Sequence, residues 1–265
     1  MAVLYNRQSL CLEDIAFGKY LLWRTGSKSV ILSTMSKLSQ SAPSTVDANL
    51  KQFYDQFRVV KFKKDELIFL ANAEPTYAYA VRSGFVRTFS YTDTNDERSI
   101  SFVLRNEMLP IAWIYTKSST ALFNYVAHTD CELYEIDRTK YHDFLVHKPE
   151  LAYTMLVHSI NDTVAKKLQI LALAQATAER KILHTFNYFS IRYGSNLLQD
   201  IIVIKIPLTQ KDIAGFTGLT RETVTNIIIK LKQQGIISVK KRLYTVHTEK
   251  LRQQIEAETE IPNLS

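Results

Sequence analysis

The chain has 265 residues, enough for one large domain or two of ordinary size. Its hydrophobic fraction of 46% and charged fraction of 22% are typical of a soluble globular protein, and no apolar run is long enough to span a bilayer. The two cysteines, Cys11 and Cys131, form no C-x-x-C pair and have no surrounding His/Cys cluster. This excludes a zinc site or a four-thiolate iron–sulfur cluster, so no metal is predicted. We expect two reduced thiols in a cytoplasmic protein.

The net charge of +7 is concentrated near the C-terminus. Residues 179–255 hold 13 Lys/Arg and 5 Asp/Glu, whereas the rest of the chain holds 20 and 21. This asymmetry suggests a polyanionic partner that one domain binds. The charge alone leaves open a solvated basic face without a partner.

Residues 1–44 show no sustained hydrophobic period and end in a serine-rich stretch. We expect an N-terminal extension with little order, and Met35, which begins Met-Ser-Lys-Leu, is a candidate start. The alternative is an N-terminal helix that packs on the following domain.

Residues 45–148 are predicted to form a β domain that begins with one amphipathic helix from Thr45. After that helix the hydrophobic period falls to about two, and short segments rich in β-branched and aromatic residues alternate with turn signals such as Ser83-Gly84. The predicted strands are 58–62, 66–70, 77–81, 84–91, 99–104, 125–128 and 131–136. So many short strands predict an antiparallel barrel or roll.

Residues 149–177 are predicted to form one long helix after a short helix at 141–146. Pro149 suits the first helical turn, and an apolar stripe follows with spacings of three or four residues. Its length without Gly or Pro favours a coiled-coil-like dimer seam over a helix packed on its own barrel. The predicted seam residues are Val157, Ile160, Val164, Leu168 and Leu171.

Residues 178–255 are predicted to form a winged helix, with a helix at 178–193, a strand at 201–206 and a helix-turn-helix after them. Thr209 and Asp212 form a capping arrangement for the first helix, and Gly218 suits the turn. Thr220 caps a second, recognition helix that runs to Gln234. Residues 256–265 are read as a tail.

The start of a recognition helix points into the major groove of DNA. Here that position holds Arg221, Glu222, Thr225 and Asn226, which suit base reading. Two predicted strands then flank a basic turn, whose residues Lys240, Lys241 and Arg242 would contact phosphate. An αα-hairpin with exposed polar residues is the alternative.

The order of elements over residues 46–255 resembles the Crp/Fnr family of bacterial transcription regulators, most sharply in Thr220-Arg-Glu-Thr-Val. The resemblance implies an α+β fold: an N-terminal antiparallel double-stranded β-roll (a jelly roll like cyclic-nucleotide-binding domains), a long dimerisation helix and a C-terminal winged helix-turn-helix. It implies a homodimer on two-fold symmetric DNA, with RNA polymerase as a further partner. It also makes Arg221 and Glu222 the main base readers and places Thr209, Thr220 and Thr223 on phosphates.

Two departures limit this resemblance. Asn226 stands where the family often has a second base-reading Arg, so we expect a half-site shifted toward adenine at one base pair. Members that bind cAMP hold its phosphate with a Gly-Glu pair and a later Arg-Ser/Thr. Residues 106–126 here have no such pair, and Lys117 is their only cation. We therefore expect no cAMP binding. The cysteine count likewise excludes the iron–sulfur cluster of the oxygen-responsive members.

Other ligands and enzyme activity have weaker support. His128, His142 and His147 leave haem open, although isolated histidines in such a roll are more often structural. The aromatic residues of the roll either line an apolar ligand pocket or fill its core; they are Trp113, Tyr115, Phe123 and Tyr125. The chain has no His-x-His pair of a metal-dependent cupin, so no enzyme is predicted. A ligand-sensing module whose winged helix contacts proteins remains the alternative function.

Overall fold

The computed structural model describes residues 50–198 and 200–257. The predicted N-terminal extension lies outside these residues, as does the start of the helix predicted from Thr45, of which residues 50–54 are described and helical. Within the described ranges, no helix is both long and apolar enough to cross a membrane.

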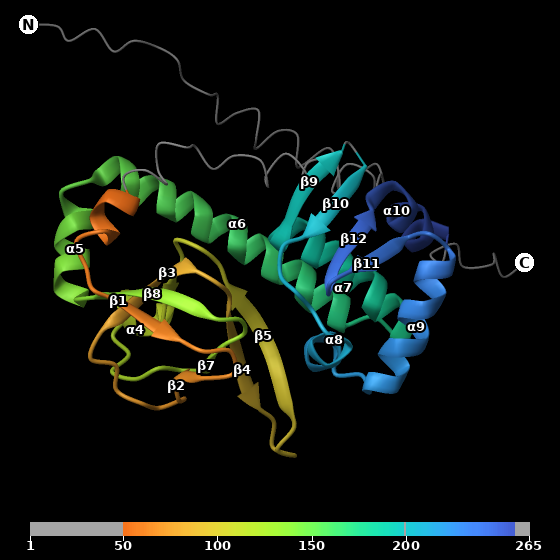
Figure 1. Ribbon diagram of the computed structural model, residues 1–265, viewed down its shortest axis with the longest axis horizontal. Helices are drawn as coiled ribbons and strands as arrows, with labels where there is room; N and C mark the ends of the chain where they lie inside the picture. Colours follow the sequence, from red (N-terminus) through yellow and green to blue (C-terminus); the bar gives the residue numbers. More distant parts are fainter. Residues whose placement is uncertain (1–49, 199, 258–265) are drawn as a thin grey trace, which may run out of the picture. The chain divides into compact units, whose positions relative to one another are not determined.

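Two four-stranded antiparallel sheets form the predicted β-roll (Figure 1). Their strand orders are β1-β8-β3-β6 and β2-β7-β4-β5. The strands are β1 Val59–Phe62, β2 Leu67–Phe69, β3 Ala78–Ser83, β4 Val86–Tyr91, β5 Glu97–Val103, β6 Met108–Leu109, β7 Asn124–Ala127 and β8 Cys131–Ile136. All seven predicted strands are confirmed, whereas β6 and the short helix α4 (Ile111–Tyr115) were not predicted.

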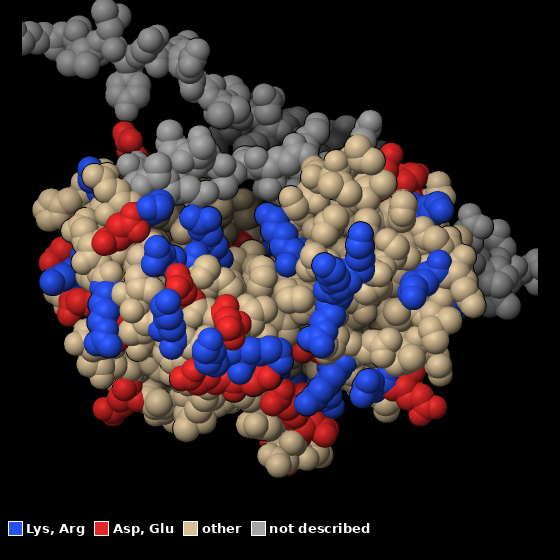
Figure 2. All heavy atoms as spheres, viewed as in Figure 1, with Lys and Arg blue, Asp and Glu red and all other residues tan. Residues whose placement is uncertain are grey.

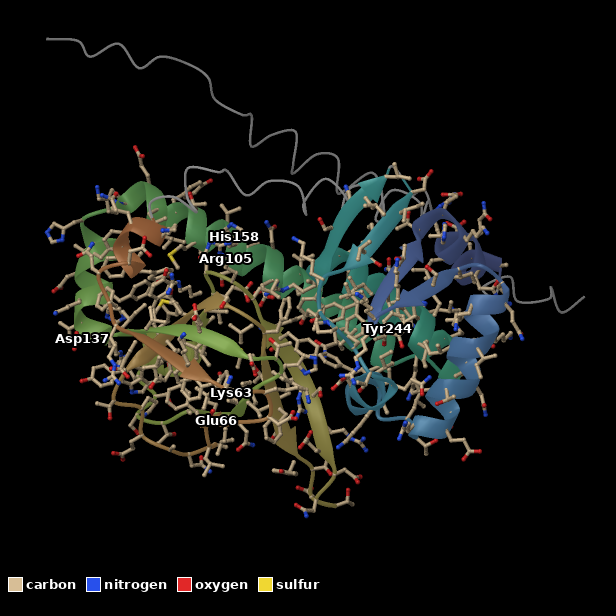
Figure 3. The ribbon with its side chains drawn as sticks, in the orientation of Figure 1. Lys63, Glu66, Arg105, Asp137, His158 and Tyr244 are labelled. Atoms are coloured by element: carbon tan, nitrogen blue, oxygen red, sulfur yellow. The ribbon has the colours of Figure 1, made fainter. Side chains whose placement is uncertain are left out.

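Local chemistry fixes the turns of the roll. Gly84 joins β3 to β4 with φ +84°, and a Cβ atom there would overlap the carbonyl oxygen of Asp130. Only glycine fits this position without strain. In the turn after β1, the backbone N–H of Lys63 donates to the carboxylate of Glu66 at 2.7 Å (Figure 3).

Two helices follow the roll, α5 (Arg138–Val146) and the 25-residue α6 (Pro149–Leu173). The carboxylate of Asp137 caps α5 by accepting from the backbone N–H of Lys140, so this helix starts three residues before its predicted start. Pro149 occupies the first turn of α6, as predicted.

A charged network joins α6 to its neighbours. The guanidinium of Arg192 lies 2.6 Å from a carboxylate oxygen of Asp162 and 2.6 Å from one of Glu107. Lys166 adds a contact of 2.8 Å to Asp162. Because Arg192 is only 16% exposed, loss of either carboxylate would leave part of a buried charge uncompensated.

This network predicts an acid-dependent loss of stability. Burial raises the pKa of Asp162, but the charge of Arg192 and the hydrogen bond from Lys166 outweigh it, so that pKa lies below the ordinary 3.8. A carboxyl with a lowered folded-state pKa stabilises the fold above its unfolded-state pKa, and this stabilisation is lost as pH falls through the folded value. We expect Asp162→Asn to lower the free energy of unfolding at neutral pH, with a difference that shrinks below pH 3.8. Urea unfolding at several pH values measures this, with exposed Asp93→Asn as the control; a pH-independent difference would contradict it.

The C-terminal part is a winged helix, as predicted. Helix α7 (Ala178–Tyr193) precedes a sheet of order β11-β12-β10-β9, and the other helices are α8 (Gln210–Thr217), α9 (Arg221–Gln233) and α10 (Thr248–Ala257). The strands are β9 Gly194–Leu198, β10 Ile201–Ile204, β11 Ile237–Lys240 and β12 Leu243–His247. Two elements of this part differ from the expectation. Strand β9 was not predicted, and α10 continues through the boundary that was placed between a domain ending at 255 and a tail.

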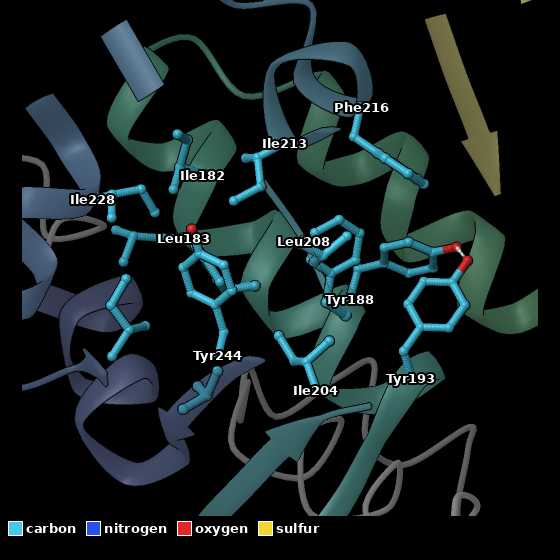
Figure 4. Close-up of a cluster of buried hydrophobic side chains, with 14 of the residues drawn as sticks. Ile182, Leu183, Tyr188, Tyr193, Ile204, Leu208, Ile213, Phe216, Ile228 and Tyr244 are labelled. Atoms are coloured by element: carbon cyan, nitrogen blue, oxygen red, sulfur yellow. Dashed lines mark hydrogen bonds between the residues drawn. The ribbon is translucent and has the colours of Figure 1, made fainter. Parts of the chain in front are cut away.

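The core of the winged helix is a large buried cluster (Figure 4). Tyr188 and Tyr193 share a hydrogen bond of 3.1 Å between their hydroxyls. Phe102 of β5 joins this cluster, stacks on Phe216 with ring centroids 5.3 Å apart, and donates its backbone N–H to the hydroxyl of Tyr193. The roll therefore contributes a side chain to the core that supports the helix-turn-helix.

Candidate nucleic-acid interface

The first helix of the helix-turn-helix, α8, starts with a reciprocal cap. The hydroxyl of Thr209 accepts from the backbone N–H of Asp212 at 3.2 Å, and the Asp212 carboxylate accepts from the backbone N–H of Thr209 at 2.7 Å. These bonds satisfy donors that a helix N-terminus leaves free. The apolar residues Ile213, Ala214 and Phe216 of this helix all lie in the core.

A left-handed glycine joins α8 to α9. Gly218 ends α8 with φ 71°, which explains the glycine at the predicted turn. The hydroxyl of Thr220 then accepts from the backbone N–H of Thr223 at 3.1 Å and starts α9. This fixes the direction of the recognition helix from its first residue, Arg221.

Helix α9 separates a buried face from an exposed one. Val224, Ile228 and Leu231 are buried, and Lys230 in the last turn lies 2.7 Å from a carboxylate oxygen of Glu179 on α7. The side chains of Arg221, Glu222 and Asn226 are exposed, as base reading requires. Thr225 is half-buried, and its hydroxyl lies 2.8 Å from both the Arg221 carbonyl and Oε1 of Gln210.

The predicted wing is a tight hairpin of β11 and β12. Lys240 pairs with Leu243, which leaves Lys241 and Arg242 as a two-residue turn. All three basic residues are exposed, and the carbonyl of Arg242 accepts from the backbone N–H of Leu208 at 2.9 Å. This bond holds the wing turn close to the start of α8.

A cleft of about 910 Å³ lies beside these elements. Thr209 before α8, Arg221 of α9 and Arg242 of the wing turn line it, and all three were predicted to contact DNA. The roll also contributes to the lining, with Lys64, Asp65, Glu97 and Asp130 among its residues. The structure thus brings the cap, the recognition helix and the wing together. Basic and acidic side chains are mixed over the roll in Figure 2, while basic ones predominate over the winged helix.

Four basic residues that line this cleft were not predicted, namely Lys64, Arg87, Arg98 and Lys211. Lys211 is exposed on the first turn of α8 and lines the cleft, a position that its place two residues after the cap could have signalled. Arg98 comes from β5, and its guanidinium carbon lies 3.9 Å from where a Cβ atom would stand on Gly218. No local sequence signal points to Arg98, because only the tertiary fold brings it there.

The predicted seam residues of α6 are not equally accessible. Ile160 is 53% and Leu171 50% exposed, whereas Val157 and Val164 are half-buried. Leu168 is partly buried and packs against the core of the winged helix. Further apolar side chains are exposed on the same helix: Tyr153, Leu156, Ile170 and Leu173.

Residues 106–126 of the roll, where no cAMP binding is expected, include α4. Lys117 is exposed after this helix, and the fold adds Arg138, whose guanidinium lies 4.9 Å from the Trp113 ring centroid. Arg138 donates to the carbonyls of Ile114 and Thr116, so its charge is already engaged there.

The aromatic residues of the roll lie in separate places. Trp113 and Tyr125 are buried in two different hydrophobic clusters, and Phe123 packs against the second of them. Tyr115 is 47% exposed, and its hydroxyl contacts that of Tyr141. Burial raises the pKa of Tyr125 to about 12. These positions correspond to the core-filling alternative more than to one shared pocket.

The three histidines of the roll and α5 each contact a backbone carbonyl oxygen. Nε2 of His128 lies 2.8 Å from the oxygen of Pro207, and Nε2 of His142 lies 2.7 Å from that of Ile114. Nδ1 of His147 lies 2.7 Å from the oxygen of Asp143. In the part of the chain that the structure describes, no three His, Cys, Asp or Glu side chains are grouped to hold a metal ion.

Comparison with known proteins matches both halves of this architecture. Residues 59–148 match the family model of the cyclic nucleotide-binding domain, and residues 179–254 match that of the Crp-like helix-turn-helix domain. The fumarate and nitrate reduction regulatory protein of Vibrio cholerae is 25% identical over 209 residues, which cover 77% of this chain and 81% of that protein. Electron transport regulator A of Shewanella oneidensis is 24% identical over 200 residues, with coverages of 75% and 79%.

Solved structures share the fold. A cyclic nucleotide-binding domain containing protein from Listeria monocytogenes superposes with a TM-score of 0.61 at 20% identity, covering 77% of this chain and 97% of that one. At this identity the likeness confirms the roll, the long helix and the winged helix, and it leaves the ligand of the roll unassigned.

Proposed function

We propose that this chain, which belongs to the Crp/Fnr family of DNA-binding transcription regulators, acts as a homodimer on a two-fold symmetric DNA site. The observation that carries this proposal is α9, which is capped by Thr220 and presents exposed Arg221, Glu222 and Asn226 beside a basic wing. A side-chain cap, an open N-terminal turn and flanking positive charge are what a helix in the major groove needs.

Each predicted contact has a chemical role. Arg221 donates two hydrogen bonds to guanine, Glu222 accepts from cytosine, and Asn226 pairs with adenine. Thr225, held against Gln210, completes this reading surface. Phosphates are bound by hydroxyl and cationic side chains around it: Thr209, Thr220, Thr223, Lys240, Lys241 and Arg242.

The test is in vitro selection of duplexes that the full chain binds, with and without a metabolite extract. We expect a palindromic site whose half-site departs from the family's at the base pair that Asn226 reads. An unaltered family half-site would contradict the role given to Asn226. Binding that does not weaken with salt would favour the second candidate, a sensing module whose winged helix contacts proteins.

The dimer is proposed to form along the exposed apolar side of α6. Ile160 lies near the middle of this helix, and a carboxylate there would face apolar side chains of the second copy. We expect Ile160→Glu to convert the dimer into a monomer in sedimentation experiments and to abolish tight binding to the palindrome. Ser159→Glu is the matched control, since it adds the same charge one residue earlier at an exposed polar position. A dimeric Ile160→Glu protein would contradict this seam.

The effector of the roll is not cAMP in this proposal. The support is the absence of the Gly-Glu pair, the engagement of Arg138 by two carbonyls, and the presence of Lys117 as the only cation of residues 106–126. Millimolar cAMP should leave the affinity for the selected duplex unchanged.

We also expect a cytoplasmic location and RNA polymerase as a partner, while the sign of regulation depends on where the site lies in a promoter.

A further inference from the structure

The reading surface of α9 contains one apolar side chain, Ile229, which is 48% exposed. The other exposed side chains of this helix are polar or charged, namely Arg221, Glu222, Asn226, Lys230, Lys232 and Gln233. Single exposed apolar residues are common on protein surfaces, so exposure alone carries no argument. The argument comes from the side of α9 on which Ile229 lies.

Helical geometry places Ile229 among the predicted base readers. Successive residues turn by about 100° around an α-helix, so relative to buried Val224 the positions of Thr225, Glu222 and Asn226 are at roughly 100°, 160° and 200°. Ile229 is at about 140° on the same scale, near the middle of this surface. Arg221 is at about 60° on this scale, so Ile229 lies between it and Asn226. Buried Leu231, at about 340°, lies opposite Ile229, and buried Ile228, at about 40°, lies about 100° away from it.

Two contacts fix this orientation. Lys230 is tied to Glu179 by a contact of 2.7 Å, and the buried residues of α9 pack in the domain core. If α9 rotated far enough to move Ile229 off the reading surface, these contacts would break. Along the helix axis Ile229 lies about 4.5 Å beyond Asn226, or one to two base pairs at roughly 3.4 Å each.

The apolar group that base pairs present in the major groove is the C5-methyl of thymine. Resting on the proposed function, we infer that Ile229 contacts a thymine methyl and specifies that base one or two base pairs from the one that Asn226 reads. The side chain has no hydrogen-bonding group, so it selects by burial of the methyl against its own apolar surface. A buried Ile contact also disfavours the exocyclic amine of cytosine, which would lose water there without a partner.

The experiment is a methyl-deletion scan of the selected duplex. Each thymine of one half-site, with its symmetry mate, is replaced by deoxyuridine, which lacks only the methyl group. Binding is then measured for the wild type, for Ile229→Ala and for Leu197→Ala. The last variant is the matched control, since it truncates an apolar side chain that is 65% exposed on β9, outside the reading surface.

We expect one thymine position at which the wild type loses about fourfold in affinity per half-site, the factor for one methyl-sized group. Ile229→Ala should bind the thymine and uracil duplexes equally there, while Leu197→Ala should retain the full difference. The inference is overturned if Ile229→Ala keeps the penalty, or if the wild type binds a selected site specifically with no such position. Failure of the proposed function itself would look different, because then no duplex would be bound specifically by any of the three proteins.

Discussion

Replacing Arg221 by alanine is expected to cost about 1–3 kcal/mol of binding free energy in each half-site. Arg221 is the first residue of α9, is exposed, and lines the cleft beside Thr209 and Arg242. Its planar guanidinium can donate two parallel hydrogen bonds to one guanine, which no other side chain does as well. The affinity for the cognate site should fall more than the affinity for random duplex, so the ratio of the two affinities should decrease.

Arg221→Lys separates base reading from charge. Lysine keeps the positive charge but not the planar pair of donors, so we expect it to retain most non-specific binding and to lose most of the discrimination. Titrations of labelled cognate and scrambled duplexes at two salt concentrations measure both quantities. Lys250→Ala, which removes an exposed cation on α10, is the control. If Arg221→Ala discriminated between the cognate and scrambled duplexes as well as the wild type does, Arg221 would not be a base reader.

Phe186→Ala should lower the free energy of unfolding of the winged helix by about 3–5 kcal/mol. Phe186 lies on α7, is fully buried, and packs against Phe189 and Tyr244 with ring centroids 6.3 and 5.2 Å away. Removing its ring leaves a cavity between α7 and the wing strand β12, and neighbours from two rigid elements close it only partly.

Chemical denaturation followed by circular dichroism measures this loss, and Leu197→Ala is the control. Leu197 is 65% exposed on β9, so its truncation should change stability by less than about 0.5 kcal/mol. Similar effects of the two substitutions would mean that the cluster around Phe186 does not limit the stability of this domain. At temperatures where Phe186→Ala is partly unfolded, DNA binding should fall in proportion.

The helix-turn-helix could be predicted from the sequence because its signals are local. Thr209 with Asp212, Gly218 and Thr220 each act within a few residues of their own position, and each does in the structure what its residue type suggests. Strand β9 could not be predicted in this way. Its sequence Gly-Ser-Asn-Leu-Leu has no alternation, and it is a strand because β10 pairs with it. Helix α10 has a local signal of its own in the spacing of Leu251 and Ile255.

Contacts between distant parts of the chain had no sequence signal at all. Phe102 sits in a strand whose pattern predicts only that it faces a core, not that this core belongs to the winged helix. Arg192 appears as one more charge at the end of α7, yet it contacts both Asp162 and Glu107. The contacts of Arg138 had no sequence signal for the same reason. Only the fold brings this side chain to the carbonyls of Ile114 and Thr116, which lie 22 or more residues away in the sequence.

The two residues of the wing turn adopt a backbone conformation that is unfavourable for their long side chains. Lys241 and Arg242 have φ values of 49° and 67°, a pair of left-handed residues that suits the twist of a two-residue hairpin. Asparagine and glycine adopt this conformation more easily than long side chains do. A protein selected for thermal stability alone would therefore drift toward Asn-Gly at this turn and lose two positive charges. Lys241 and Arg242 thus combine a strained backbone with two positive charges, and replacing them to relieve the strain would remove that charge from the wing. Stabilising designs should therefore leave these two positions untouched.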